Sequence, residues 1–287
     1  MKASPALKSV APAEPAESAE SAEPAEIHGY LPSGPDGDVV YHVRHRCVGD
    51  CRGAVVLAGP IGLERTHAYS TGVRWARHLA RNGFDVLRFD YRGLGESTGR
   101  LADFDLHSWV DDIGAAASEL ASARPDVPLT VHGIRGGALL AARAFDDRIG
   151  DRLLLWEPPQ SGRAMFTEIL RRKLASDYAQ HVGGDRKTRE SYILDLEAGS
   201  TVEAEGYDWS PAWWRSAQDF PLIVPTRDGA SEWMIVHLDG RAADRHVAAR
   251  NTHSVRVPKP PFWGESKWIR PDLSELFDLC TDWLRQP

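Results

Sequence analysis

Short apolar segments alternate with stretches of helical spacing along most of this chain. Ala54–Ala58 (AVVLA) is an apolar run bounded by glycines, and Arg152–Trp156 (RLLLW) is a similar run. Such runs are typical of strands that are buried on both faces of a parallel sheet. His67–Arg81 has apolar residues at helical spacing, and Trp109–Ala121 and Ala138–Phe145 are also expected to be helical. The alternation predicts right-handed βαβ units, and so an α/β fold with a mostly parallel central sheet flanked by helices.

The remaining predicted elements extend this pattern. A hairpin near residues 27–45, which contains the β-rich segment Val39–His45, would add antiparallel edge strands. The other predicted strands are Asp85–Asp90, Leu129–His132, Glu232–Leu238 and Ser254–Val257. The other predicted helices are Ala242–Arg250 and a closing helix, Leu273–Leu284.

Two segments do not follow the alternation. Residues 1–26 consist mostly of Ala, Pro, Glu and Ser, and we expect a disordered tail because they cannot bury enough apolar surface. Residues 158–230 hold a basic helical segment, a glycine-rich stretch and the tryptophan-rich YDWSPAWW. We interpret them as a cap inserted into a single domain that spans residues 27–287. Large amphipathic rings in a cap would suit an apolar ligand, although some must be core.

Composition argues against several classes of protein. The net charge is −7, from 34 basic and 41 acidic residues, which is unlike the basic surface of a nucleic-acid-binding protein. The first residues lack the apolar run of a signal peptide, and no stretch is long enough to span a membrane, so we expect a cytoplasmic protein. Three cysteines suit a reducing compartment. Cys47 and Cys51 flank a short turn, but we see no further ligands at matching spacing, so we expect no metal and no cofactor.

Two motifs carry a resemblance to a known superfamily. Phe89–Gly99 (FDYRGLGESTG) follows a predicted strand, and residues 132–141 (HGIRGGALLA) read as strand, turn and helix. They resemble the D-x-R-G-x-G-x-S turn and the G-x-S-x-G nucleophile elbow of α/β hydrolases. With the order of elements, the likeness covers nearly all of residues 27–287 and implies the α/β-hydrolase fold. The second motif has Arg135 where the elbow carries its serine.

The substitution at Arg135 removes the usual chemistry. Gly133 and Gly137 keep the tight turn, but a guanidinium stays protonated and cannot attack a carbonyl. In the chain order of this fold, Asp239 fits the position of the acid, whereas no histidine occurs beyond His253, which would precede the last strand. The sequence therefore predicts a degenerate triad and no Ser-His-Asp hydrolysis.

A narrower resemblance points to a ligand class. The G-x-R-x-G elbow, the run LLLWEPPQSGRAMFTEILRRKLA and the segment PPFW resemble the exosortase A system-associated hydrolase 2 proteins. Those proteins accompany acyl-carrier and acyl-activating proteins in biosynthetic clusters. The resemblance implies a small acyl or carrier-bound ligand and makes an acyl carrier protein a candidate partner. The basic face of Arg171, Arg172 and Lys173 could dock such an acidic partner, although a solvated helix face is the favoured interpretation.

The role of Arg135 remains open between two alternatives. Its charge would lie at a helix N-terminus, which repels cations, so an anion must compensate it. The anion could be internal, from Asp239, Glu64 or Glu157, which the fold places near the carboxyl ends of strands. It could equally be a carboxylate or phosphate of a ligand, which a guanidinium binds through two hydrogen bonds.

The loop AGPIGLERTHAY takes the position of the oxyanion hole, so backbone N–H groups near Ile61 could hold an oxyanion. Glu64, His67 and Glu157 are candidate general acids or bases, while Glu64 and His67 could equally cap the following helix. Ser97 and Ser161 are weaker candidate nucleophiles, since neither lies at an elbow. The other residues that we expect to line the site are Pro60, Ile134, Gly136 and Trp263.

Three hypotheses follow for the function. The first is a protein that binds an acyl or amino-acyl ligand, or transforms it without a covalent intermediate, with Arg135 holding an anionic group. The second is a catalytically silent scaffold or carrier-protein partner in which Arg135 is neutralised internally. The third is a hydrolase with an unorthodox nucleophile. The sequence says nothing about the oligomeric state.

Overall fold

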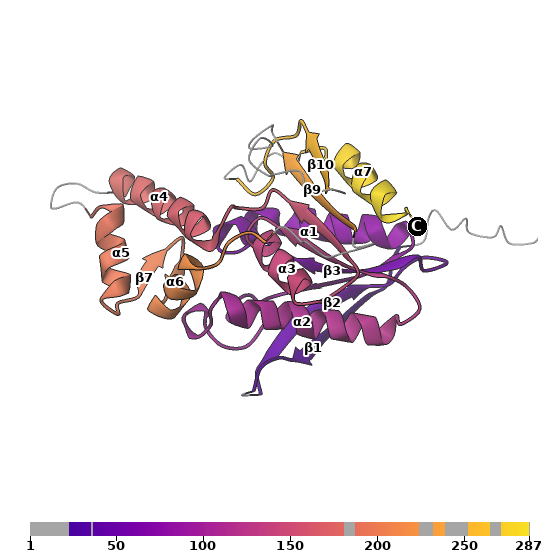
Figure 1. The fold of residues 1–287 in the computed structure, drawn as a ribbon, viewed down its shortest axis with the longest axis horizontal. Coiled ribbons are helices and arrows are strands. Elements are labelled where there is room, and N and C mark those ends of the chain that lie inside the picture. Colours follow the sequence, from indigo (N-terminus) through magenta and orange to yellow (C-terminus); the bar gives the residue numbers. More distant parts are fainter. Residues whose placement is uncertain are drawn as a thin grey trace, which may run out of the picture.

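A central eight-stranded sheet organises the protein (Figure 1). The computed structural model describes residues 23–35, 37–180, 187–223, 232–238, 252–264 and 271–286. The strand order is β1-β2-β4-β3-β5-β6-β9-β10. In chain order these strands are β1 (Glu26–Pro32), β2 (Val39–His45), β3 (Gly53–Ala58), β4 (Phe84–Phe89), β5 (Leu129–Ile134), β6 (Arg152–Trp156), β9 (Glu232–Leu238) and β10 (Thr252–Val257).

Strand pairing follows the predicted pattern. The six strands from β4 to β10 in the sheet pair in parallel, whereas β1 pairs with β2, and β2 with β4, in antiparallel fashion. The N-terminal hairpin therefore forms the edge that the sequence predicts. The prediction of an α/β fold with a mostly parallel sheet flanked by helices is confirmed.

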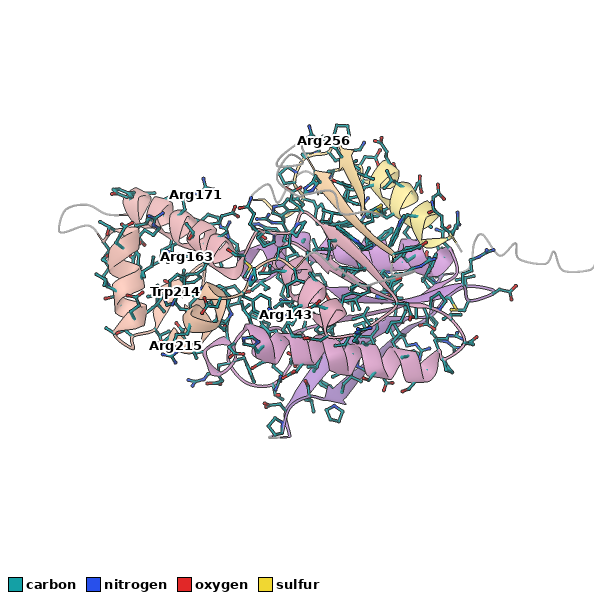
Figure 2. All side chains as sticks on the ribbon, viewed as in Figure 1. Arg143, Arg163, Arg171, Trp214, Arg215 and Arg256 are labelled. Carbon is teal, nitrogen blue, oxygen red and sulfur yellow. The ribbon has the colours of Figure 1, made fainter. Side chains whose placement is uncertain are left out.

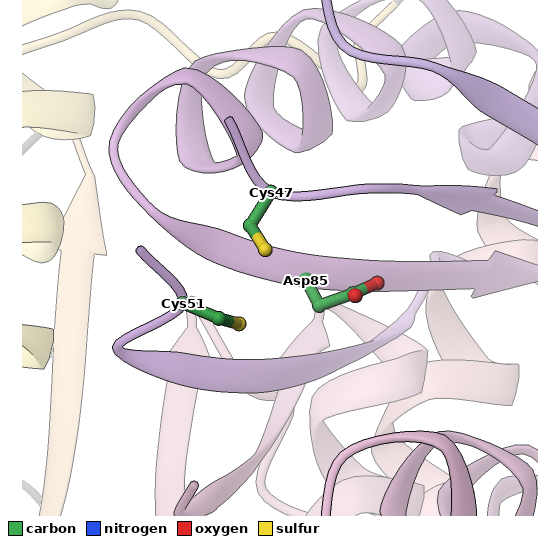
Figure 3. Close-up of side chains that lie close together, drawn as sticks. All are labelled: Cys47, Cys51 and Asp85. Atoms are coloured by element: carbon green, nitrogen blue, oxygen red, sulfur yellow. The ribbon is translucent and has the colours of Figure 1, made fainter. Parts of the chain in front are cut away.

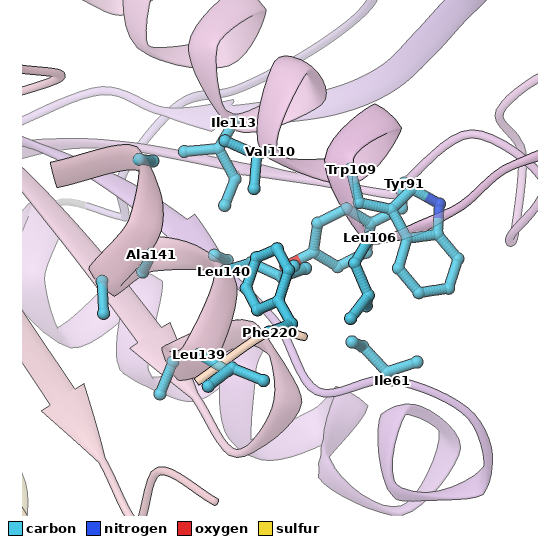
Figure 4. Close-up of a cluster of buried hydrophobic side chains, with 14 of the residues drawn as sticks. Ile61, Tyr91, Leu106, Trp109, Val110, Ile113, Leu139, Leu140, Ala141 and Phe220 are labelled. Atoms are coloured by element: carbon cyan, nitrogen blue, oxygen red, sulfur yellow. The ribbon is translucent and has the colours of Figure 1, made fainter. Parts of the chain in front are cut away.

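Helices cover both faces of the sheet. One face packs against α1 (Leu63–Arg81) and α7 (Ser274–Leu284), and the other against α2 (Leu106–Ala123) and α3 (Gly136–Asp146), beside a short 3-10 turn at Leu101–Asp103. Strand β3 shows why its sequence is apolar throughout. Ala54 and Val56 face the α2 and α3 core, part of which Figure 4 shows, while Val55 and Leu57 face the α1 and α7 core.

The segment between β6 and β9 forms its own small layer at one end of the molecule (Figure 1). Aromatic rings hold this layer together: the ring centroids of Trp209 and Trp213 lie 4.5 Å apart, and Phe166 packs 5.5 Å from Trp209. All three rings are fully buried, so these tryptophans are core residues and not a ligand surface. The elements of this layer are α4 (Gly162–Gln180), α5 (Arg189–Glu197), β7 (Val202–Ala204), β8 (Tyr207–Trp209) and α6 (Pro211–Gln218).

Some predicted boundaries were wrong. Helix α1 begins at Leu63, four residues before the predicted start, because Gly62 with a φ of 63° starts it without the usual capping side chain. His67 therefore lies in the second turn and does not cap the helix. Strand β1 begins at Glu26, which pairs with His45, so this residue does not belong to the predicted tail. Residues 23–25 of the predicted tail are also described, whereas residues 1–22 and the predicted helix Ala242–Arg250 lie outside the described residues.

None of the described helices is both long and apolar enough to cross a membrane.

His132 in the core makes stability depend on pH. Its ring is fully buried between Trp75 and Trp156, and its Nδ1 lies 2.8 Å from the carbonyl oxygen of Leu154. Burial lowers the pKa of His132 to about 4. Between pH 6.5 and pH 4 the ring is therefore protonated in the unfolded chain but neutral in the folded protein. The contribution of His132 to the free energy of unfolding should therefore be fully present above pH 6.5. It should decrease by about 3 kcal/mol as the pH falls to 4.

Urea unfolding at pH 7 and pH 5 measures this effect. His107 is exposed, so His107→Asn serves as the control. His132→Asn should reduce the pH dependence of the free energy of unfolding by the share of His132, while His45, whose pKa burial also lowers to about 4, keeps its own share. Equal free energies of unfolding at both pH values would contradict the account.

Candidate functional site

Arg135 stands at the tip of a strained turn between β5 and α3. Its backbone has a φ of 54° and a ψ of −122°, which a non-glycine residue seldom adopts. The turn is tight on both sides: a Cβ on Gly133 would lie 2.4 Å from the Cα of Ala138, and one on Gly137 would lie 2.2 Å from the carbonyl oxygen of Gly59. Only glycine fits at these two positions, as the sequence indicates.

The Arg135 guanidinium is held by two carboxylates. Its Nε and Nη2 donate to the two oxygens of Glu64 at 3.1 and 3.0 Å, and Nη2 also donates to Oε2 of Glu168 at 2.8 Å. Nη1 lies 3.4 Å from the carbonyl oxygen of Glu157, and the Trp263 ring stacks 5.2 Å from the guanidinium carbon. Burial opposes the charge, but the carboxylates outweigh burial and raise the pKa of Arg135 above its ordinary value. Arg135 is thus a permanent cation.

The ion pairs continue into the inserted layer. Nη1 of Arg172 lies 3.6 Å from Glu64, and its Nε donates to the carboxylate of Glu205. Glu205 lies in the turn between β7 and β8 and also accepts from the backbone N–H of Leu63 at 3.3 Å. The network therefore joins the elbow, the start of α1 and the inserted layer. Glu168 and Glu205 were not predicted as site residues, because their local sequence does not show how the inserted layer packs against the sheet.

The loop expected to form an oxyanion hole is largely covered. Ile61 is buried and packs on the elbow, so that a Cβ on Gly136 would lie 2.8 Å from its Cδ1. The N–H of Leu63 on the same loop is already bonded to Glu205. As the first residue of α3, Gly136 has an N–H without an intrahelical acceptor, but the side chains of Ile61 and Met165 crowd its Cα. Of the backbone N–H groups around this loop, that of Leu63 is therefore already engaged, and that of Gly136 lies beside apolar side chains.

A cavity of about 500 Å³ opens beside Arg135. Its charged lining is balanced, with three carboxylates and three guanidiniums, and several apolar side chains complete the wall. Of the expected ligand-binding residues, only Trp263 lines this cavity. Pro60 and Ile134 line a separate cavity of about 50 Å³, and neither cavity includes Ile61 or Gly136 in its lining. The lining of the large cavity includes Leu63, Glu64, His67, Arg135, Glu157, Pro158, Ala164, Glu168, Arg171, Arg172, Leu238 and Trp263.

Two further titratable residues of the lining keep other contacts. Nδ1 of His67 lies 3.3 Å from the carbonyl oxygen of Trp263. A carbonyl can only accept, so this contact places a proton on Nδ1, and in the neutral ring Nε2 is then the acceptor. Oε2 of Glu157 accepts from the N–H of Leu238 at 2.7 Å and lies 3.8 Å from Nδ1 of His237. The carboxylate of Glu157 thus faces β9 and does not pair with Arg135.

The comparisons with known proteins agree with this architecture. A hypothetical protein from Pseudomonas aeruginosa is 18% identical, with 94% of this chain and 98% of that chain covered and a TM-score of 0.61. An α/β serine hydrolase without a lid from Xanthomonas campestris is also 18% identical, with 91% and 96% covered and a TM-score of 0.54. This chain has the α/β-hydrolase fold.

Other comparisons are consistent with this fold. Est1E from Butyrivibrio proteoclasticus, solved with ferulic acid bound, is 21% identical, with 90% of this chain and 96% of that chain covered and a TM-score of 0.56. A family model described as serine aminopeptidase, S33 matches residues 50–180. No curated protein matches the sequence.

In the α/β-hydrolase fold the tip of the elbow carries the nucleophile. In this structure the turn between β5 and α3 carries Arg135 at its tip. The substitute nucleophiles that we considered are engaged elsewhere. Ser97 Oγ donates to the carbonyl of Asp90 at 2.5 Å, and Ser161 Oγ accepts the N–H of Ala164 at 3.1 Å at the start of α4. His253, expected before the last strand, is the second residue of β10 and pairs with Met234. Asp239 lies outside the described residues.

Cys47, Cys51 and Asp85 lie together at another part of the sheet (Figure 3). One ligand atom from each lies within 4.8 Å of the others, so Asp85 is a neighbour that the sequence analysis missed. Both oxygens of Asp85 accept from guanidiniums, those of Arg44 and Arg124, and Arg124 also contacts Cys47 Sγ at 3.3 Å. Burial raises the pKa of Cys47 to about 11. A protonated thiol and a neutralised carboxylate make a poor donor set for a metal ion.

Proposed function

We propose that this protein binds a small acyl ligand with an anionic group in the large cavity, without a serine mechanism. The observation that carries the proposal is the position of Arg135. Its side chain occupies the tip of the elbow and lines a cavity of about 500 Å³. That volume falls within the range of roughly 300–1,000 Å³ that is common for small-molecule sites.

The lining of the cavity suits such a ligand. Leu63, Ala164 and Leu238 offer apolar surface to a hydrocarbon chain, and Arg135 and Arg171 offer guanidinium donors to an anion. The resemblance to exosortase A system-associated hydrolase 2 proteins also favours an acyl ligand. Est1E, which shares the fold, has been solved with an aromatic carboxylic acid bound.

Proton transfer, if the bound ligand reacts, would fall to His67 or Glu157. Glu64 is a poor base because Arg135 donates to both of its oxygens and Arg172 lies 3.6 Å away. His67 has Nε2 as an acceptor when Nδ1 contacts Trp263, and its side chain lines the cavity. A step of this kind would be non-covalent general acid–base chemistry.

A catalytically silent scaffold is the second candidate. It is favoured by the internal pairing of Arg135 with Glu64 and Glu168, which leaves no uncompensated charge at the elbow. An acyl carrier protein would then bind the surface and not the cavity. The two candidates differ in whether an acyl compound without its carrier protein binds.

Thermal unfolding with octanoyl-CoA and octanoyl-carrier protein tests the proposal. At a ligand concentration about 100 times Kd, octanoyl-CoA should raise Tm by about 5 °C or more. Arg135→Ala should abolish the shift because the anion loses its partner, whereas Arg215→Ala, at an exposed position of α6, should retain it. A shift with the carrier conjugate alone, which also persists in Arg135→Ala, would favour the scaffold and contradict the proposal.

A further inference from the structure

The two carboxylates on Arg135 are held very differently. Glu64 accepts from both Nε and Nη2, and its side chain is 12% exposed. Glu168 accepts only from Nη2, and its side chain is 47% exposed. A buried contact with two hydrogen bonds is much stronger than a single solvated one. Glu64 is therefore the fixed partner of Arg135, and Glu168 is the partner that can be exchanged.

Glu168 stands where an anion in the cavity would bind. It projects from α4 into the cavity lining and places its carboxylate 2.8 Å from Nη2 of Arg135. The other donors of Arg135 are directed to Glu64 and to the carbonyl of Glu157. A carboxylate that enters the cavity would reach the guanidinium most readily by replacing Glu168.

Helix α4 offers Glu168 a second partner. Arg171 follows three residues later, and residues three apart lie on one face of a helix. Arg171 is exposed and also lines the cavity, and Figure 2 shows it on the outer side of α4. Within the described part of the chain, no carboxylate lies at ion-pair distance from it, whereas Arg172 already contacts Glu205 and Glu64. Glu168 can thus leave Arg135 and remain paired.

We infer that the anion bound at Arg135 is the free carboxylate of an apolar acid, which replaces Glu168 while Glu168 moves to Arg171. The inference rests on the proposed function and narrows its ligand class from acyl compounds to free carboxylic acids. Every charge stays paired through the exchange: Arg135 keeps Glu64 and gains the ligand, and Arg171 gains Glu168. The apolar part of the acid lies along Leu63 and Ala164, which also line the cavity.

Calorimetric titration with octanoate and octanamide tests this exchange. Removing the competing carboxylate with Glu168→Gln should tighten octanoate binding about tenfold, which corresponds to one charge-assisted hydrogen bond. Arg171→Ala should weaken octanoate binding several-fold, because the displaced Glu168 then has no partner. Octanamide should bind all variants equally. Glu197→Gln, an exposed change of the same charge on α5, should behave as wild type.

The outcomes separate the two proposals. Unchanged or weaker octanoate binding in Glu168→Gln would overturn the exchange. An equal gain in affinity for octanamide would overturn it as well, because it would indicate only a wider cavity. If octanoyl-CoA stabilises the protein while octanoate binds no variant, the proposed function stands and the carboxylate inference fails. If neither compound binds, the proposed function fails as well. Thermal unfolding of each variant checks that it is folded, and Arg171→Ala, at an exposed position, provides an independent test.

Discussion

Gly137→Ala is expected to lower the free energy of unfolding by about 4 kcal/mol, which is as large as the loss from a severe substitution in a protein core. The added Cβ would lie 2.2 Å from the carbonyl oxygen of Gly59 and 2.3 Å from that of Ala58. Both contacts are with backbone, so no side-chain rotation can relieve them, and α3 must move away from β3. That shift would carry Arg135 away from Glu64.

Urea unfolding followed by circular dichroism measures the loss, and α1 supplies a matched control. A Cβ on Gly72 meets nothing within 4 Å, and alanine favours a helix over glycine, so Gly72→Ala should be neutral or slightly stabilising. Wild-type stability in Gly137→Ala would show that the elbow is not the tight turn described above.

Glu64→Gln should lower the free energy of unfolding by about 3–5 kcal/mol, the usual result of removing one partner from a buried ion pair. Glu64 is 12% exposed and compensates Arg135, which is 13% exposed, while also lying 3.6 Å from Arg172. A neutral amide leaves the Arg135 cation with only the solvated carboxylate of Glu168, next to the positive end of the α3 dipole.

Replacing both partners, as in Glu64→Gln with Arg135→Met, should recover most of this loss because no buried charge is then left unpaired. Urea unfolding of wild type, both single variants and the double variant provides the comparison. A single Glu64→Gln variant as stable as wild type would mean that Glu64 does not compensate Arg135.

The sheet could be predicted well because its signal is local. The runs Val39–His45, Arg152–Trp156 and Glu232–Leu238 are bounded by turn residues and match β2, β6 and β9. The start of α1 was missed because Gly62 replaces the usual side-chain cap. The apolar pattern of a strand reflects burial of a few neighbouring residues and can be read from the sequence. The start of α1 depends instead on the backbone conformation of Gly62, which is set by the surrounding fold.

The site could be predicted only in part, because its partners are distant in sequence. Gly133 and Gly137 fix the elbow locally, so the position of Arg135 followed from the motif. Glu64 was one of three carboxylates that we considered, and the structure pairs it with Arg135. Glu168 comes from the inserted layer, and its approach depends on how α4 packs over the elbow, which no local pattern encodes.

A strained cation is an unusual occupant for this turn. A non-glycine residue in the conformation of Arg135 costs about 1–3 kcal/mol, and burial of a guanidinium at a helix N-terminus adds to that cost. The carboxylates of Glu64 and Glu168 offset the charge but cannot relieve the backbone. Strain of this kind persists where a side chain must point at a particular place, here the cavity.

Intact-mass measurement after incubation with a fluorophosphonate tests the central claim most directly, because the probe labels serines that act as nucleophiles. The account predicts no adduct on the wild-type protein, since a protonated guanidinium occupies the elbow and the hydroxyls of Ser97 and Ser161 are bonded elsewhere. A stoichiometric adduct that forms at the rate of an ordinary serine hydrolase would contradict it.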